Sequence, residues 1–119
     1  MRFDLAFWYE REPSSPEQAA QIYIRLAEEE LGIVERNPAV GDFYQEVIST
    51  YEDLAQESAD ASPWNSPVYC NGECVITPIA WSRHQEVGPA LIAMAARHGV
   101  TSFDPQDRSV HHPSGRSAH

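Results

Sequence analysis

The sequence predicts an α+β fold in one domain. Three observations support this prediction: an N-terminal segment that alternates with a period of two, apolar residues at helical spacing in three later segments, and an Asn-Gly turn signal between two apolar runs. With 119 residues, 42% of them hydrophobic, the chain has the length and composition of a domain with a single core. We expect the domain to cover residues 1–113 and a flexible tail to follow at 114–119.

Five short segments predict strands. In the first of them, every second residue from Phe3 to Tyr9 is Phe, Leu or Tyr, which is the side-chain period of a strand. Asn71-Gly72 predicts a two-residue hairpin turn, and Pro78 predicts that the second hairpin strand lies at an edge or bulges there. The predicted strands are residues 2–9, 68–70, 74–81, 100–103 and 108–111.

The first two helices are predicted in the N-terminal half. Ser15 can cap the first helix, with Pro16 in its first turn and Gln18 at the position that completes a capping box. We expect this helix to end at Gly32, with three glutamates in its last part. The second helix, residues 40–55, keeps a continuous apolar face, and we expect that face to pack on the N-terminal strand.

A third helix is predicted after the hairpin. Ser82 can cap it, with Gln85 in the capping-box position, and its apolar residues continue until Gly99. Pro89 would kink this helix unless its regular part begins near Val87. The order of elements is strand, helix, helix, strand, strand, helix and strand, with a short final strand. This order resembles a ferredoxin-like split βαβ sheet that has a two-helix first crossover and a central β-hairpin.

The negative charge of the chain is concentrated in its first half. Residues 1–60 contain 14 acidic residues and 4 arginines, whereas residues 61–119 contain 4 of each, so the first 60 residues account for the whole net charge of −10. Such a field repels nucleic acid and anionic lipid and steers a basic partner toward the protein. The sequence shows neither the roughly 18-residue apolar run of a membrane span nor a signal-peptide pattern. We therefore expect a cytoplasmic protein with no membrane or nucleic-acid partner.

Eight acidic residues are candidates for contacting a basic protein. Three of them stand near the carboxyl end of the first predicted helix, where negative charge opposes the helix dipole. Acids on neighbouring turns also repel one another, so recognition of a basic surface would explain them; a solvated helix face that aids solubility is the alternative. The candidate partner-binding residues are Glu28, Glu29, Glu30, Glu35, Asp42, Glu46, Glu52 and Asp53.

The two cysteines are expected to be ordinary thiols. If the hairpin turn has two central residues, Cys70 faces Glu73, and the sulfur atoms of Cys70 and Cys74 point to opposite sides. A three-residue loop would set the cysteines opposite each other and permit a disulfide, which a reducing cytoplasm disfavours. A zinc site would need two further ligands, and no histidine has the spacing to supply them. We therefore expect no metal and no cofactor.

A pocket for a small molecule, or a small enzyme, is the alternative hypothesis. The sequence contains no nucleophile elbow, no phosphate-binding glycine loop and no HExxH motif, so it assigns no catalytic residue and favours a protein that is not an enzyme. Trp81 and Arg83 stand at a strand-to-helix junction and could line a pocket with Asp104 and Trp64. The structural alternative is an aromatic core anchor, a capping serine and an arginine paired with a carboxylate.

Several short motifs spread along the chain carry a family resemblance. They are Phe3-Asp4-Leu5 followed by Trp8, Ser62-Pro63-Trp64, Trp81-Ser82-Arg83 with Glu86-Val87, His98-Gly99, and Phe103-Asp104-Pro105-Gln106. Together they resemble a group of short, poorly characterised bacterial proteins whose members are similar to immunity or accessory proteins of secreted polymorphic toxins. The resemblance covers nearly all of residues 1–113, includes neither cysteine and implies no catalytic residue.

The leading hypothesis is a small acidic protein-binding module, an immunity protein that neutralises a cognate toxin by occluding its active site. Small size, concentrated negative charge and the resemblance all favour this class, because a nuclease or other basic toxin offers the complementary surface. We expect a monomer or a weak homodimer. A structural module that dimerises through the exposed edge of its sheet is the third hypothesis.

Overall fold

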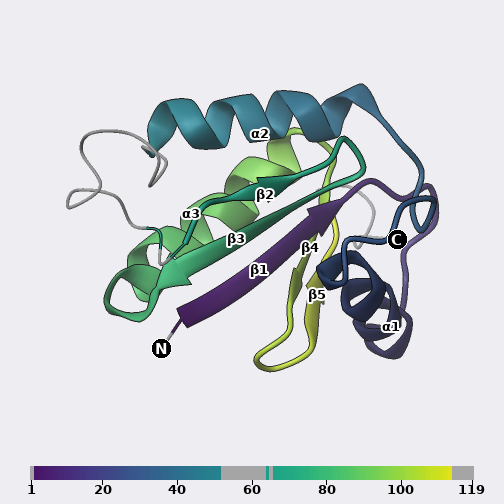
Figure 1. The fold of residues 1–119 in the computed structure, drawn as a ribbon, viewed down its shortest axis with the longest axis horizontal. Coiled ribbons are helices and arrows are strands. Elements are labelled where there is room, and N and C mark those ends of the chain that lie inside the picture. The colour runs from purple at the N-terminus through teal and green to yellow at the C-terminus, as the bar shows by residue number, and fades with distance from the viewer. Residues whose placement is uncertain (1, 52–63, 65, 114–119) are drawn as a thin grey trace.

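Five antiparallel strands form the centre of the protein in the computed structural model, which describes residues 2–51, 64 and 66–113 (Figure 1). Their bounds are Arg2–Trp8 for β1, Tyr69–Cys70 for β2, Cys74–Ala80 for β3, Thr101–Asp104 for β4 and Ser109–His111 for β5. Across the sheet the strands follow the order β2, β3, β1, β4, β5. Each of the five segments that predict a strand therefore contains one.

The strand connections agree with the predicted α+β fold. β1 pairs antiparallel with β3 on one side and with β4 on the other, so β3 and β4 run parallel to each other. A strand inserted between two parallel strands that a helix connects is the defining feature of a split βαβ unit. β2 pairs with β3 as the hairpin, and β5 extends the sheet beside β4. The connection from β1 to β2 contains two helices, as predicted for the first crossover.

Within the described residues, three helices cover the two faces of this sheet (Figure 1). They are Pro16–Ala27 for α1, Pro38–Thr50 for α2 and His84–Arg97 for α3. α2 and α3 pack on the face that carries Leu5 and Phe7, whereas α1 packs on the face that carries Ala6 and Trp8. The alternation of β1 explains this division, because successive side chains of a strand point to opposite faces. All four side chains are fully buried, so β1 is central to both cores.

The apolar face of α2 packs on β1, as its spacing predicts. Phe43 has no exposed area, and the centroid of its ring lies 4.6 Å from that of Phe7. Tyr51 follows the last helical residue, has an extended backbone and is partly buried against the same core. The helix therefore ends at Thr50, and the remaining residues of the predicted helix, 52–55, lie outside the described part of the chain.

The two capping boxes that the sequence predicts have different outcomes. At the start of α1, Ser15 and Gln18 form the predicted box, in which each side chain binds the backbone N–H of the other. At the start of α3, the Ser82 box is absent, because a single 3₁₀ turn, Trp81–Arg83, occupies those residues. α3 begins at His84 and contains Pro89, so its regular part does not wait until Val87, the start that the sequence suggests.

The turn of the β2–β3 hairpin lies one residue later than predicted. Cys70 pairs with Val75 and not with Glu73. The Asn71 side chain fixes this turn, because it accepts the backbone N–H groups of Glu73 at 2.9 Å and Cys74 at 3.1 Å. The partner of Cys70 changes from Glu73 to Val75, a shift of two residues, which keeps each side chain on its predicted face. The two cysteines therefore still point to opposite faces, as expected.

The two thiols should differ in reactivity. Cys74 is fully buried, and this burial raises the pKa of its thiol to about 12, whereas Cys70 is partly buried on the other face. Because the thiolate is the reactive form, iodoacetamide at about pH 8 should modify Cys70 in the native protein and leave Cys74 unmodified. Peptide mass spectrometry measures both sites, and protein unfolded in guanidinium is the control in which both react. Equal labelling of the native protein would contradict the prediction.

Glu73 fixes the segment between α1 and α2. Its side chain is 4% exposed, and both carboxylate oxygens accept the backbone N–H of Gly32 at 3.0 Å. The Nε atom of Arg36 lies 3.8 Å from the same carboxylate. A buried carboxylate left without these donors would destabilise the fold, so the bonds are strongly favoured. Glu73 thereby holds the chain that leaves α1 against the tip of the β2–β3 hairpin.

Candidate functional site: an acidic groove at the end of α1

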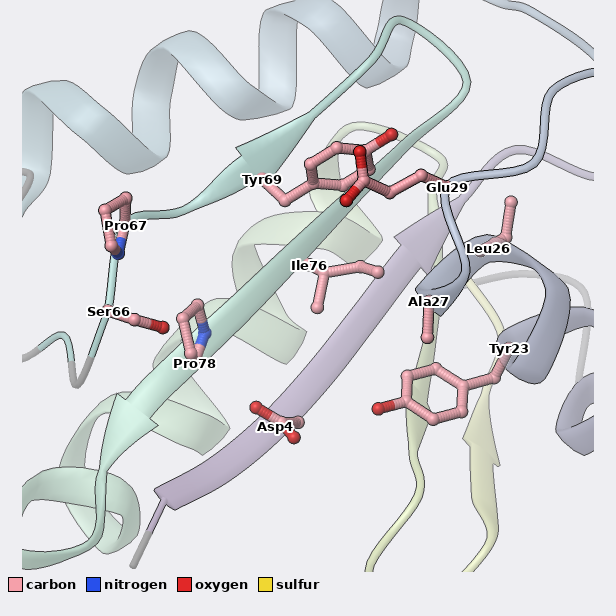
Figure 2. Close-up of a pocket in the computed structure, with 10 residues that line it drawn as sticks. All are labelled: Asp4, Tyr23, Leu26, Ala27, Glu29, Ser66, Pro67, Tyr69, Ile76 and Pro78. Atoms are coloured by element: carbon pink, nitrogen blue, oxygen red, sulfur yellow. The ribbon is translucent and has the colours of Figure 1, made fainter.

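A groove of about 250 Å³ lies between the end of α1 and the β2–β3 hairpin (Figure 2). It forms because α1 packs over β4 and β5 and leaves part of the same sheet face uncovered. In Figure 2, Tyr23 points across β1 toward Asp4, and Glu29 extends toward Tyr69. We call this the acidic groove; its lining is Asp4, Tyr23, Leu26, Ala27, Glu29, Ser66, Pro67, Tyr69, Ile76 and Pro78.

Two prolines limit how far β2 extends along the groove. Continuing the β2–β3 register places Pro67 opposite Pro78, and a proline has no N–H to donate to a ladder. β2 is therefore only the two residues Tyr69–Cys70, and β3 has no β2 partner at the level of Pro78. β3 lies between β2 and β1 and pairs with β1 through Pro78 without a bulge, so the prediction of an edge strand or bulge is wrong for the strand as a whole. An unpaired edge exists at the level of Pro78, where proline rings border the groove.

Asp4 enters the groove because of the alternation of β1, which places it on the same face as Ala6 and Trp8. The β1–β4 register would place Pro105 opposite Asp4, where a proline cannot donate to the ladder. The Gln106 side chain takes over this role: its amide nitrogen donates to the Asp4 carbonyl and its oxygen accepts the Asp4 N–H, both at 2.8 Å. These two bonds hold the backbone that carries the Asp4 carboxylate.

Glu29 occupies the left-handed backbone position that closes α1. The N–H groups of Glu29 and Glu30 donate back to carbonyls of the last helical turn at 2.9 and 3.2 Å, which is a Schellman motif. The left-handed residue of this motif is usually glycine, as it is at the end of α3, where Gly99 has φ 74°; Glu29 has φ 62°. The prediction that the first helix continues to Gly32 is therefore wrong, because this motif ends α1 at Ala27.

Replacing Glu29 with glycine should stabilise the protein. A residue other than glycine in the left-handed region costs roughly 1 kcal/mol, so Glu29→Gly should raise the free energy of unfolding by about 1 kcal/mol in a urea titration. Glu28→Gly is the control, because Glu28 has φ −88° and gains nothing from the freedom of glycine. A loss of stability in Glu29→Gly would show that the glutamate side chain supports the fold.

The predicted partner-binding acids lie on both sides of the sheet. Glu28 and Glu29 follow the last residue of α1, whereas Asp42 and Glu46 belong to α2 on the opposite face. Within the described part of the chain, Glu28, Glu29 and Asp42 form no ion pair. The eight predicted residues therefore do not form one surface. Glu29 lines the acidic groove, whereas Glu35 lines a separate hollow with Tyr9 and Ile22.

Two further predicted acids are paired with arginines. Glu30 lies 3.2 Å from Arg25, and Glu35 lies 2.8 Å from Arg11. All four side chains are substantially exposed, and exposed pairs contribute little to stability, roughly 0–1 kcal/mol. The pairs nevertheless reduce the net charge that these two glutamates can present to a partner.

Glu46 connects α2 with α3. Its carboxylate accepts the Nε2–H of His98 at 2.6 Å and pairs with Arg97 at 2.9 Å. The hydrogen bond from His98 is the main cause that holds the pKa of the Glu46 carboxyl below its usual value, and Arg97 lowers it further. Glu46 therefore acts within the fold. The last two predicted acids, Glu52 and Asp53, lie outside the described residues.

The four residues of the predicted alternative pocket have separate surroundings. Trp64 is 3% exposed and belongs to the core beneath α2 and α3. Arg83 pairs with Glu86 at 3.0 Å, and this contact raises the pKa of the guanidinium and lowers that of the carboxyl. Asp104 lines a hollow, and Trp81 stacks on His84, which lines the same hollow.

That hollow has a volume of about 260 Å³ and lies between α3, the start of β1 and the end of β4. His84 stacks on Phe3 and on Trp81, with ring centroids 4.7 and 4.2 Å apart, and Trp81 is 43% exposed. Asp104 also lines the hollow, and its carboxylate accepts the backbone and side-chain N–H groups of Gln106. We call this site the aromatic hollow.

Among the described residues that line the acidic groove, Glu29 is the one that the sequence also names as a candidate, so Asp4, Tyr23 and Tyr69 are missed. A signal was present for Asp4, because a carboxylate between large apolar residues on both sides of a strand needs a specific environment. The two tyrosines carry no comparable signal, since aromatic residues are common in strands and helix cores.

Comparisons with known proteins give no family for this chain: no family model, no curated protein and no solved structure matches it. The described residues contain no group of three or more side chains that could hold a metal ion. Among the helices of that same part, none is both long and apolar enough to cross a membrane. A function is therefore argued from the chemistry of the acidic groove and its surroundings.

Proposed function

We propose that this chain is an acidic protein-binding module that recognises a basic protein through the end of α1 and the acidic groove beside it. The observation that carries the proposal is Glu29, a carboxylate in a left-handed position at the carboxyl end of a helix, where both the backbone and the dipole favour another residue. Glu28 also lies at the carboxyl end of the helix, where the dipole disfavours negative charge, and neither glutamate forms an ion pair within the described residues. Recognition of positive charge is a function that such an arrangement serves.

The partner that we propose is a bacterial toxin, which the chain neutralises by covering its active site. The net charge of −10, all of it from residues 1–60, supports a partner with a basic surface. A toxin that binds nucleic acid carries such a surface, because it must neutralise phosphates. The resemblance of the sequence motifs to immunity and accessory proteins supports the same class.

Coexpression with a toxin domain identified among the genes that neighbour the one for this chain tests the proposal. The wild-type chain should rescue growth and bind the purified toxin, and association should slow as ionic strength rises. Reversing the charges of Glu28 and Glu29 to lysine should slow association by about tenfold and flatten its salt dependence. Circular dichroism should show an unchanged fold in this double variant.

The matched control reverses Glu12 and Glu17, which are exposed acids outside the groove. This variant changes the net charge by the same amount. Glu17 lies in the first turn of α1 and Glu12 precedes that helix, so the association rate should fall less than in the Glu28 and Glu29 variant. Equal effects in both double variants would place the interface elsewhere. Absence of both rescue and binding in the wild type would refute the proposed function.

A small-molecule-binding function is the second candidate, and the exposed Trp81 beside the aromatic hollow favours it. The hollow, with about 260 Å³, is slightly smaller than the roughly 300–1,000 Å³ found for ligand pockets, so a small planar ligand is the suitable class. A fragment screen followed by tryptophan fluorescence tests this candidate, since the other described tryptophans, Trp8 and Trp64, are buried. Fragments whose signal persists in Trp81→Phe would argue against the hollow.

A further inference from the structure

The walls of the aromatic hollow suit a flat ligand. Phe3 and His84 line it, with ring centroids 4.7 Å apart and an angle of 26° between the ring planes. Trp81 stacks on His84 and is 43% exposed, so its indole adds accessible aromatic surface beside the hollow. Aromatic rings contact one another in offset-stacked or edge-on arrangements, which a flat ligand can also adopt. A planar ring is therefore the shape that these walls favour.

Gly88 leaves part of the α3 side of the hollow without a side chain. A β-carbon added there would lie 3.7 Å from the ring of Phe3 and 4.0 Å from a methyl group of Leu5, which are ordinary contact distances. Glycine inside a helix costs stability relative to alanine, and Gly88 lies inside α3. Alanine would therefore fit and favour the helix, so the fold does not explain the glycine. Open space against α3 is what this residue provides.

Asp104 brings a nearly buried carboxylate to the hollow. The residue is 9% exposed, and it forms no ion pair with any described residue. Its Oδ1 atom accepts the backbone and side-chain N–H groups of Gln106, whereas Oδ2 accepts no hydrogen bond within the described part of the chain. Burying a carboxylate is costly unless opposite charge and hydrogen bonds compensate it. A ligand with a positive charge and N–H groups would supply both.

His84 supplies a second acceptor to the lining. Its Nδ1 atom lies 2.5 Å from the backbone carbonyl oxygen of Trp81, which can only accept, so Nδ1 carries a hydrogen. In the neutral imidazole, Nε2 then holds a lone pair, and no described residue donates to it. The lining therefore contains a carboxylate and an imidazole nitrogen, both of which suit N–H groups of a ligand.

We infer that the aromatic hollow binds a small planar cation with N–H groups, such as an aromatic amidinium, that lies against Phe3 and His84 and donates to Asp104. The inference rests on the second candidate function, small-molecule binding, and names the ligand class of that site. It is independent of the recognition of a basic protein by the end of α1. The volume of about 260 Å³ suits a single ring with a short substituent.

The probe for a direct test is benzamidine, titrated into isotope-labelled protein and followed by amide NMR signals. Saturable shifts are expected at His84 and Gly88. Benzamide, which has nearly the same shape without the charge, should bind at least about fivefold more weakly, and so should methylguanidine, a planar cation without a ring. Equal affinity of benzamidine and benzamide would overturn the requirement for a cation. Absence of saturable shifts at both residues would overturn the inference.

Two matched variants separate the hollow from the general acidic field. Asp104→Asn removes the charge but keeps an oxygen for the N–H groups of Gln106, and it should weaken benzamidine binding by about fivefold. Asp107→Asn removes the same charge from the turn between β4 and β5, outside the lining, and should change the affinity by less than about twofold. Equal losses in the two variants would mean that the field alone attracts the probe, and would overturn the role of Asp104.

A second pair of variants tests the space at Gly88. Gly88→Ala should weaken benzamidine binding by about fivefold without lowering the melting temperature, because the methyl group occupies the hollow and alanine favours the helix. Gly41→Ala is the control in α2, where an added β-carbon meets nothing within 4 Å, and it should leave the affinity unchanged. Unchanged affinity in Gly88→Ala would overturn the position of the ligand against α3. A lower melting temperature in this variant would overturn the argument from the glycine, and the Asp104 variant would then decide the ligand class.

The same titrations distinguish a failure of this inference from a failure of the second candidate function. If benzamide and other neutral fragments bind the hollow as tightly as benzamidine does, the ligand class is wrong and small-molecule binding stands. If neither benzamidine nor any fragment shifts the signals of the hollow, both fail. Preference for benzamidine that is lost in Asp104→Asn and kept in Asp107→Asn supports both.

Discussion

Replacing Phe43 with alanine should lower the free energy of unfolding by about 3–5 kcal/mol, the loss expected for a fully buried phenylalanine. Phe43 has no exposed area, and its ring lies 4.6 Å from Phe7 and 6.1 Å from His98 between centroids. Alanine would leave a cavity between α2 and the sheet at the point where these elements meet. Because domains of this size have roughly 5–15 kcal/mol of stability, the loss should appear as a large shift of a urea midpoint.

Two further variants test whether packing is the cause. Phe43→Leu keeps most of the apolar volume and should cost less than Phe43→Ala. Ser49→Ala, on an exposed position of the same helix, should change the free energy of unfolding by less than about 0.5 kcal/mol. A loss below about 1 kcal/mol in Phe43→Ala would mean that the buried face of α2 is assigned wrongly.

The elements that the sequence predicts well are those with a strong local pattern. The period of two in β1 and the Ser15 capping box of α1 each fix several backbone groups within a few residues of one another. The apolar residues on the face of α2 that carries Phe43 recur over several turns, so a change in one of them would not alter the prediction of a helix. In each case the information needed is close in the sequence.

The elements that differ from their predictions depend on specific hydrogen bonds that residue preferences do not specify. The hairpin turn is centred one residue late because the Asn71 side chain accepts the N–H groups of Glu73 and Cys74. In this position Glu73 also accepts the N–H of Gly32, 41 residues away. Likewise, α1 ends at Ala27, before the usual stop signal at Gly32. It ends there because Glu29 adopts the left-handed backbone conformation that closes the helix, which glycine adopts more easily. Local propensity does not contain these contacts.

The candidate site shows the same limit. The acidic residues are evident in the sequence, but their division between two faces follows from the path of the chain around the hairpin tip. Asp4 and Tyr23 meet because a strand and a helix that are separated in sequence share one sheet face. A list of acids therefore identifies Glu29 as a candidate, whereas only the fold shows the aromatic and apolar residues that lie beside it.

One acid outside the candidate set is expected to matter most for stability. The Glu10 side chain is 11% exposed, and Trp8 Nε1–H donates to its carboxylate at 3.0 Å. The Ser14 N–H and the Thr101 hydroxyl donate to the same carboxylate at 3.1 and 3.2 Å, and His112 Nδ1 lies 3.3 Å from it. Glu10 therefore joins β1, the start of α1, β4 and the chain that follows β5.

Replacing Glu10 with alanine should cost about 3–5 kcal/mol, because it leaves buried donors without an acceptor and His112 without its carboxylate. The loss should be measured by urea unfolding, followed by the fluorescence of the buried Trp8 and Trp64. Glu12→Ala is the matched control: Glu12 is exposed, and its removal should change stability by less than about 0.5 kcal/mol. Glu10→Gln should lie between the two, because one amide oxygen still accepts while the new NH₂ faces donors. Similar losses for Glu10→Ala and Glu12→Ala would show that the loss of negative charge, and not the loss of these hydrogen bonds, sets the effect.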